Sequence, residues 1–199
     1  SLALAIPAHA APAPNIVLML IDDLGWQEMK CYDIDAPSPA DTPNMDALAK
    51  RGILFRHAYS PAPSCTPSRC AIMSGNHPAR AQTTCVAGGK PPGGNPRQRM
   101  ITPWFRGGMP ANEQTIARTL RENGYATGHA GKWHMSASHD GFPGALDQGF
   151  DFTSGGRGIT QGMGDRLQNF ATDQPGDPYR LDAEGFPTDS VTVGALKFM

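Results

Sequence analysis

Runs of apolar residues mark three candidate β-strands along the chain. The first covers residues 15–21 (NIVLMLI), a continuous apolar run of the kind found in strands buried on both faces of a parallel sheet. Residues 53–60 (ILFRHAYS) predict a second strand, and residues 125–134 (YATGHAGKWH) begin as a third that breaks at Gly131. Helix signals separate these segments, so the strands come from distant parts of the chain.

Four segments carry helix signals. Residues 42–52 begin with a capping threonine followed by proline and end in glycine, and residues 66–75 (TPSRCAIMSG) predict a short helix that starts with proline. Residues 112–124 predict a third helix, and residues 188–199 predict an amphipathic helix capped by its first or second residue. The alternation predicts an α/β fold, with a mostly parallel sheet flanked by helices on both faces.

Polar and reactive side chains follow each predicted strand. Asp22 and Asp23 come after the first strand, Cys65 after the second, and Lys132 and His134 lie at the end of the third. Ligands of such sheets bind outside the carboxyl ends of the strands. We therefore expect these side chains to form one site.

Asp22 and Asp23 suit a metal ion. Adjacent carboxylates repel each other unless a cation lies beside them, and their oxygens are the ligands that calcium and magnesium prefer. The alternative is a solvated turn in which one aspartate caps a backbone N–H group.

Cys65 and Arg69 predict an anion-binding site. The start of a helix presents free N–H groups and a positive dipole end, which favours an anion and lowers the pKa of a thiol. Arg69 lies one helical turn later and can reach back toward residue 65 with a fork of donors. The alternative is a buried or disulfide-bonded cysteine before an ordinary proline-started helix.

The other cysteines leave several pairings open. Cys31, Cys65, Cys70 and Cys85 allow two disulfides in an oxidising compartment, and Cys31 with Cys85 is one pairing. Their spacings match no zinc motif. Cys70 lies within a predicted helix, where we expect a small buried apolar residue.

The net charge and the N-terminal residues indicate where the protein is located. Lysine and arginine number 17 against 18 for aspartate and glutamate, a net charge of -1 that gives no support for broad binding to nucleic acid or membrane surfaces. Residues 1–10 resemble the end of a secretory signal peptide with an A-x-A-like cleavage pattern, and no later apolar run is long enough to span a membrane. We expect a periplasmic or secreted protein. Both ends of the sequence look cut, which predicts a piece of a longer protein.

The long segment 76–112 is rich in glycine, proline, arginine and threonine, and connections of this length are usually functional. We expect its part from Cys85 to Asn112 to form a wall of the substrate pocket. The residues concerned are Arg97, Arg99, Trp104, Phe105 and Arg106. The arginines either meet an acidic sugar or are simply solvated.

The stretch C-T-P-S-R at residues 65–69, followed by MSGNHPAR, resembles the signature of type I sulfatases, members of the alkaline-phosphatase-like superfamily. The resemblance continues over the segments NIVLMLIDDLGW, TPNMDALAKRGILFRHAYS, TLRENGYATGHAGKWH and DQGFDF, and so covers residues 15–152. It implies that residues 11–199 are the N-terminal part of a sulfatase catalytic domain.

The resemblance also implies a chemistry. Cys65 would be oxidised by a formylglycine-generating enzyme to Cα-formylglycine, whose hydrate has two hydroxyl groups. One would attack the sulfur of a small-molecule or carbohydrate sulfate ester, and the other would later expel sulfate. Asp22, Asp23 and residue 65 would bind a divalent ion, usually calcium, with magnesium as the alternative.

The same resemblance gives roles to the basic residues. Arg69 would hold the formylglycine and metal region, Lys132 would bind the sulfate, and His134 would hydrogen-bond the hydrate. In isolation, Lys132 would instead be an ordinary exposed lysine and His134 a packed histidine. The family's remaining metal ligands and its second His and Lys have no convincing equivalents before Met199, so we expect the 199 residues alone to have negligible activity.

Two other functions remain open from the sequence. A related class with the same fold hydrolyses phosphate or phosphonate esters. A non-catalytic anion-binding protein with an unmodified Cys65 is the second alternative.

Overall fold

The computed structural model describes residues 13–33, 35–86, 97, 99, 104–136, 142–154 and 187–199, with side chains of the last segment described from residue 191. The chain divides into two units, Ser1–Ala58 and Tyr59–Met199. The expected leader at residues 1–10 lies outside the described residues.

The first unit contains the 3-10 helix η1 (Lys30–Tyr32) and the helix α1 (Pro43–Arg51). Helix α1 confirms the predicted helix, with proline at its first position, but the expected cap is wrong, because the Thr42 side chain accepts no hydrogen bond from the first turn. The carboxylate of Asp46 accepts hydrogen bonds from the Cys31 backbone N–H at 2.9 Å and from the Thr42 hydroxyl at 3.1 Å. These bonds tie η1 to the start of α1.

The strands expected at residues 15–21 and 53–60 are not formed, and both predictions are wrong for this structure. The apolar side chains of residues 16–21 are 45 to 64% exposed instead of buried on both faces. An apolar run indicates what a segment must bury, whereas a strand also needs a hydrogen-bonding neighbour. Within the described parts of the chain, the ladder that the structure forms joins two other segments.

The second unit holds a parallel pair of strands. β1 (Gly128–Ala130) pairs with β2 (Phe152–Ser154), with Gly128 opposite Phe152 and Ala130 opposite Ser154. The short helix η2 (Leu146–Gln148) precedes β2. β1 ends before Gly131, whose φ of 95° suits glycine, so the predicted third strand and its break are confirmed.

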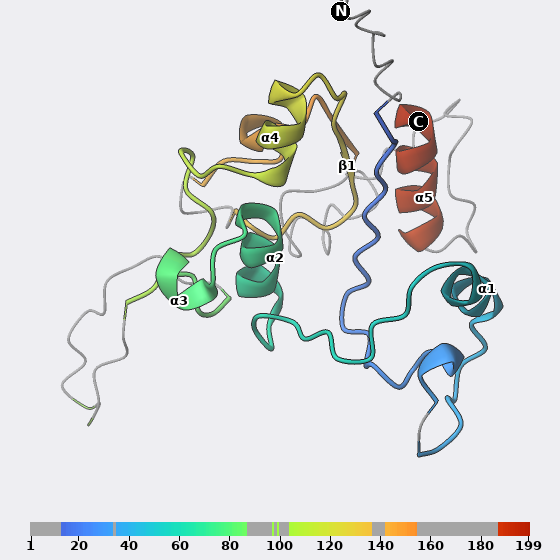
Figure 1. The fold of residues 1–199 in the computed structure, drawn as a ribbon. Helices are drawn as coiled ribbons and strands as arrows, with labels where there is room; N and C mark the ends of the chain where they lie inside the picture. The colour runs from blue at the N-terminus through green and yellow to red at the C-terminus, as the bar shows by residue number, and fades with distance from the viewer. Residues whose placement is uncertain are drawn as a thin grey trace, which may run out of the picture. The chain divides into compact units, whose positions relative to one another are not determined.

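Helix α5 (Pro187–Phe198) covers one face of this sheet (Figure 1). Gly128 and Gly194 allow the close approach, because a Cβ at either position would overlap Phe198 or Ser154. The rings of Phe152 and Phe198 stack with their centroids 5.6 Å apart. The C-terminal helix is therefore formed as predicted and begins slightly earlier, at Pro187.

The opposite face of the sheet carries the core of the second unit. Successive residues of a strand point to opposite faces, so His129 lies on the side away from α5. Two helices contribute core residues here, α2 (Cys65–Ser74) and α4 (Ile116–Glu122), and the short helix α3 (Pro78–Ala81) contacts α2. The core comprises Cys70, Met73, Met109, Ala117, Trp133, Met135 and Ala145. Helices thus flank a parallel sheet on both faces, as the α/β prediction requires.

Two helix boundaries differ from expectation. α2 starts at Cys65, so proline is its third residue and not its first. α4 starts at Ile116 because Thr115 caps it, its hydroxyl accepting a hydrogen bond from the Arg118 N–H at 3.1 Å. Among the residues that the structure describes, none of the helices combines the length and apolar character needed to cross a membrane.

Candidate active site

Two serine hydroxyls stabilise the loop that precedes Cys65. The hydroxyls of Ser60 and Ser68 both donate to the Ala62 carbonyl, at 2.8 and 2.7 Å, and lie 2.9 Å from each other. Cys65 follows as the first residue of α2 and is half-buried. Pro67, which lacks an N–H, lies in the first turn, where helical N–H groups have no intrahelical acceptor.

The first turn of α2 holds the segment of residues 132–134 through two hydrogen bonds. The Thr66 hydroxyl donates to the His134 carbonyl at 2.9 Å, and Arg69 Nη1 donates to the Lys132 carbonyl at 2.5 Å. Both donor side chains are buried, with 1% exposure for Thr66 and 8% for Arg69. The structure therefore brings together Cys65 and the segment of Lys132 and His134. The sequence pattern does not indicate a role for Thr66, because its hydrogen-bond partner lies 68 residues away.

Trp133 anchors the middle of that segment. Its side chain is 1% exposed and packs in the core, whereas Lys132 and His134 on either side of it are half-buried. Burial thus alternates along residues 132–134. The backbone is not a regular strand, however, because His134 has a φ of 51°, a left-handed conformation that is strained for a residue with a Cβ.

A mostly buried histidine lies beneath the segment. The His129 ring packs edge-on against Trp133 at a centroid distance of 5.2 Å and against Phe150 at 5.5 Å. Burial, and secondly the charge of Arg69, lower the pKa of His129 to about 4, while a hydrogen bond with the Lys132 backbone opposes the shift. At neutral pH the ring is uncharged. Nothing in the sequence pattern marks this residue.

The four cysteines differ in environment, and all are free thiols. The disulfides that the sequence left open are therefore not formed in this structure. Cys70 is 2% exposed, as predicted for a small core residue, and burial together with Glu113 raises its pKa to about 12. Cys85 is exposed. Of the four, Cys65 is the thiol at the start of a helix.

Asp22 and Asp23 belong to the first unit. Both side chains are exposed and share a turn, in which Asp23 has a left-handed φ of 57°. Adjacent carboxylates are suitable donors for a hard divalent cation. Cys65 belongs to the second unit, and the meeting of these carboxylates with Cys65 stays a prediction.

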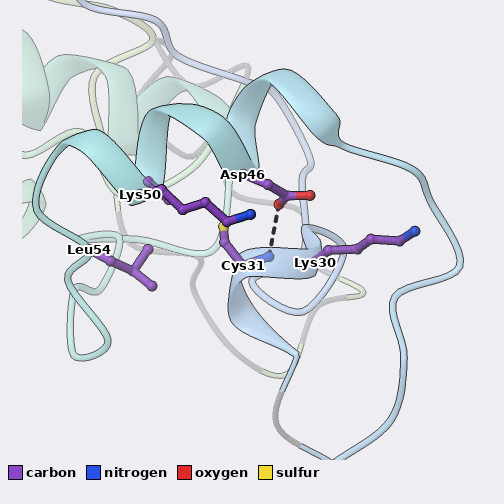
Figure 2. A pocket seen from close by; sticks show the side chains of 6 residues that line it. Lys30, Cys31, Asp46, Lys50 and Leu54 are labelled. Atoms are coloured by element: carbon purple, nitrogen blue, oxygen red, sulfur yellow. Dashed lines mark hydrogen bonds between the residues drawn. The ribbon is translucent and has the colours of Figure 1, made fainter.

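The first unit also has an open pocket of about 370 Å³ (Figure 2). It is lined by Lys30, Cys31, Asp46, Ala49, Lys50 and Leu54. Burial and the neighbouring Asp46 raise the pKa of the Cys31 thiol, which keeps it protonated and poorly nucleophilic. The pocket includes none of the site residues predicted from the sequence.

The expected substrate wall is described only in part. Trp104 is 43% exposed, and Phe105 and Arg106 are half-buried. The Arg106 N–H donates to the Gln82 carbonyl at 2.6 Å, which fixes the end of the loop to the residue after α3. Residues 87–96, 98 and 100–103 lie outside the described residues.

The structure is that of an α/β protein, with a parallel sheet between helices. A cysteine starts one of these helices, beside a Lys-Trp-His segment. Residues 14–198 match the family model described as Sulfatase. The chain belongs to the sulfatase family.

Individual relatives are sulfatases, in agreement with the family model. The chain is 42% identical to human (Homo sapiens) arylsulfatase A over 140 residues, which is 70% of this chain and 24% of that protein. It is 37% identical to human N-acetylgalactosamine-6-sulfatase over 145 residues, 72% of this chain and 26% of that protein. A solved structure described under the metabolism of multiple glycosaminoglycans by Bacteroides thetaiotaomicron is 31% identical, with a TM-score of 0.50 over 66% of this chain and 26% of that one. The chain thus spans about a quarter of the length of these relatives.

Proposed function

We propose that this chain is the N-terminal part of an enzyme that hydrolyses sulfate esters. Residues 11–199 would form the first part of its catalytic domain, after a leader ending near residue 10. The polypeptide that carries this chain with the rest of that domain is called the complete enzyme below. Membership of the sulfatase family supports the reaction class. The observation that carries the proposal is the pair of hydrogen bonds from the first turn of α2 to the Lys132 and His134 carbonyls.

Cys65 is the nucleophile position in this proposal. A formylglycine-generating enzyme would convert its CH2SH side chain to an aldehyde. The hydrate of that aldehyde supplies one hydroxyl to attack sulfur and a second to expel sulfate. Half-burial at the start of a helix suits this role, since helix N–H groups stabilise an anion that reaches residue 65.

A divalent cation fits the carboxylate donors of the first unit. Asp22 and Asp23 would hold it together with residue 65, and calcium or magnesium suits an oxygen-donor set. Bound there, it would offset the charge on the sulfate oxygens and favour ionisation of the attacking hydroxyl.

The remaining roles fall to side chains of the second unit. Lys132 would bind a sulfate oxygen through its ammonium group, and His134 would hydrogen-bond the hydroxyl of residue 65 and move its proton. Arg69 is buried and donates to the Lys132 carbonyl, so it would orient this segment as well as hold the region of residue 65. The substrate would be a small-molecule or carbohydrate sulfate ester, and the enzyme would be periplasmic or secreted.

Two measurements on the complete enzyme test the proposal. The first is the mass of the peptide that contains residue 65, isolated from the native host, where we expect the change from CH2SH to CHO. The second is kcat/KM for an aryl sulfate and for the corresponding aryl phosphate, where we expect preference for the sulfate. Preference for phosphate would assign the enzyme to phosphate ester hydrolysis. An unmodified cysteine without turnover would indicate an anion-binding protein.

A further inference from the structure

Thr66 has a buried hydroxyl that none of the proposed catalytic roles uses. Its side chain is 1% exposed, and its hydroxyl donates to the His134 carbonyl at 2.9 Å. A buried hydroxyl is costly unless it is hydrogen-bonded, so this bond is a specific feature of the site.

The bond belongs to a clamp with two donors. Thr66 and Arg69 are three residues apart and therefore lie on the same face of α2. Their acceptors, the carbonyls of Lys132 and His134, are two residues apart in the chain. Thr66 holds the end of the segment that carries the histidine.

That end of the segment needs to be held. His134 has a φ of 51°, and a left-handed conformation costs a residue with a Cβ about 1–2 kcal/mol. Trp133, buried in the core, fixes the residue before it, and the Met109 N–H donates to the Met135 carbonyl at 2.9 Å after it. The Thr66 bond is a contact at the strained residue itself.

We propose that Thr66 is a positioning residue that holds the His134 backbone, and so aims the imidazole at the neighbouring residue 65. Cys65 and Thr66 are consecutive in the same helical turn, so this bond links the position of the nucleophile directly to that of the histidine. The inference rests on the proposed function for its catalytic consequence, although the hydrogen bond can be tested without it.

The test replaces the hydroxyl and keeps the shape of the side chain. In the complete enzyme, Thr66→Val removes the donor, and Thr66→Ser keeps it. With rates expressed per formylglycine, we expect Thr66→Val to lower kcat about 10- to 100-fold with little change in KM, as for a misplacement of about 1 Å. Thr66→Ser should stay within about 3-fold of the wild type, because it retains the bond. Ser74→Ala is a matched control, because its hydroxyl bonds the Cys70 carbonyl at the far end of α2 and should leave kcat unchanged.

A double-mutant cycle with His134→Ala shows whether Thr66 acts through the histidine. We expect Thr66→Val to cause no further loss of kcat in that background. An equal loss in both backgrounds would overturn the proposal, as would a loss explained entirely by lower formylglycine occupancy.

A crystal structure of the Thr66→Val variant separates this inference from the proposed function. We expect the His134 carbonyl to turn away from residue 66 and φ to leave the left-handed region. An unchanged His134 would refute the positioning role, whatever the enzyme hydrolyses. A wild-type complete enzyme that carries formylglycine but turns over no sulfate ester would instead refute the proposed function.

Discussion

Single side chains of the second unit are held by groups far away in the sequence. The Lys132 carbonyl accepts a hydrogen bond from Arg69 Nη1 and also interacts with the His129 ring. A cationic guanidinium and a neutral imidazole therefore contact the same backbone oxygen. Burial of the ring, and secondly the charge of Arg69, lower the pKa of His129, so protonation of this ring would weaken the arrangement.

The pH dependence of stability should therefore contain a contribution from His129. Its pKa is about 4 in the folded state against 6.5 normally, so the unfolded state binds more protons between these values. The free energy of unfolding should rise with pH across this window, by about 3 kcal/mol from this group at about 1.4 kcal/mol per pKa unit. The contribution is complete above pH 6.5 and is lost as the pH falls toward 4.

Denaturant unfolding of the complete enzyme and of its His129→Phe variant, measured between pH 4.5 and 7.5, checks this. The variant should lose free energy of unfolding less steeply than the wild type as the pH falls. A difference between the two proteins that does not change with pH would contradict the assignment.

Lys132 offers a second prediction at the residue scale. If its ammonium binds the sulfate in both ground and transition states, Lys132→Met should raise KM and lower kcat/KM by at least about 10-fold. The Lys132 backbone carbonyl, which Arg69 holds, remains in the variant, so the melting temperature should change little. Steady-state kinetics with an aryl sulfate, together with a melting curve, would show this; a lowered melting temperature with unchanged KM would mean that Lys132 is structural.

Among the elements, α4 depends on one threonine. Thr115 is fully buried; its hydroxyl accepts from the Arg118 N–H at the start of α4 and donates to the Gln148 carbonyl at 2.6 Å. It thereby joins the cap of α4 to η2, which leads into β2.

Thr115→Val should destabilise the complete enzyme by about 2 kcal/mol, through loss of an N-cap and of a buried hydrogen bond. Thr119→Val on the same helix is the matched control, because Thr119 is exposed and bonds the Gln114 side chain. We expect the control to cost less than half as much in denaturant unfolding. Equal losses would show that the buried bond contributes little.

The helices and strands also differ in how well the sequence predicts them. Helix α1 was predicted because its signals are local, from the proline at its start to the glycine after its end. The strand expected at residues 15–21 failed because pairing is decided by distant segments, which an apolar run does not specify. The residue types of the proposed site are predicted from a motif, whereas the Thr66 bond and the packing around His129 depend on contacts across the fold.

At the scale of the whole molecule, the activity expected of this chain depends on how much of the proposed catalytic domain it contains. It spans about a quarter of the length of its relatives, and the apolar side chains of residues 16–21 are largely exposed in its structure. The two carboxylates at Asp22 and Asp23 are fewer oxygen ligands than a calcium ion usually takes. Under the proposed function, tight metal binding and the full set of charges around a sulfate would therefore require more of the domain.

The purified 199-residue chain should accordingly hydrolyse an aryl sulfate negligibly, even when residue 65 has been converted to formylglycine, whereas the complete enzyme should turn over the same ester. Added calcium should stimulate the complete enzyme after chelator treatment and should not activate the chain alone, because half of a coordination shell binds the ion weakly. Rates of both proteins, measured with and without chelator and normalised to formylglycine content, decide the matter. Normal turnover by the isolated chain would mean that residues 1–199 already contain a sufficient site, and that Asp22, Asp23, Cys65, Lys132 and His134 need no further ligands.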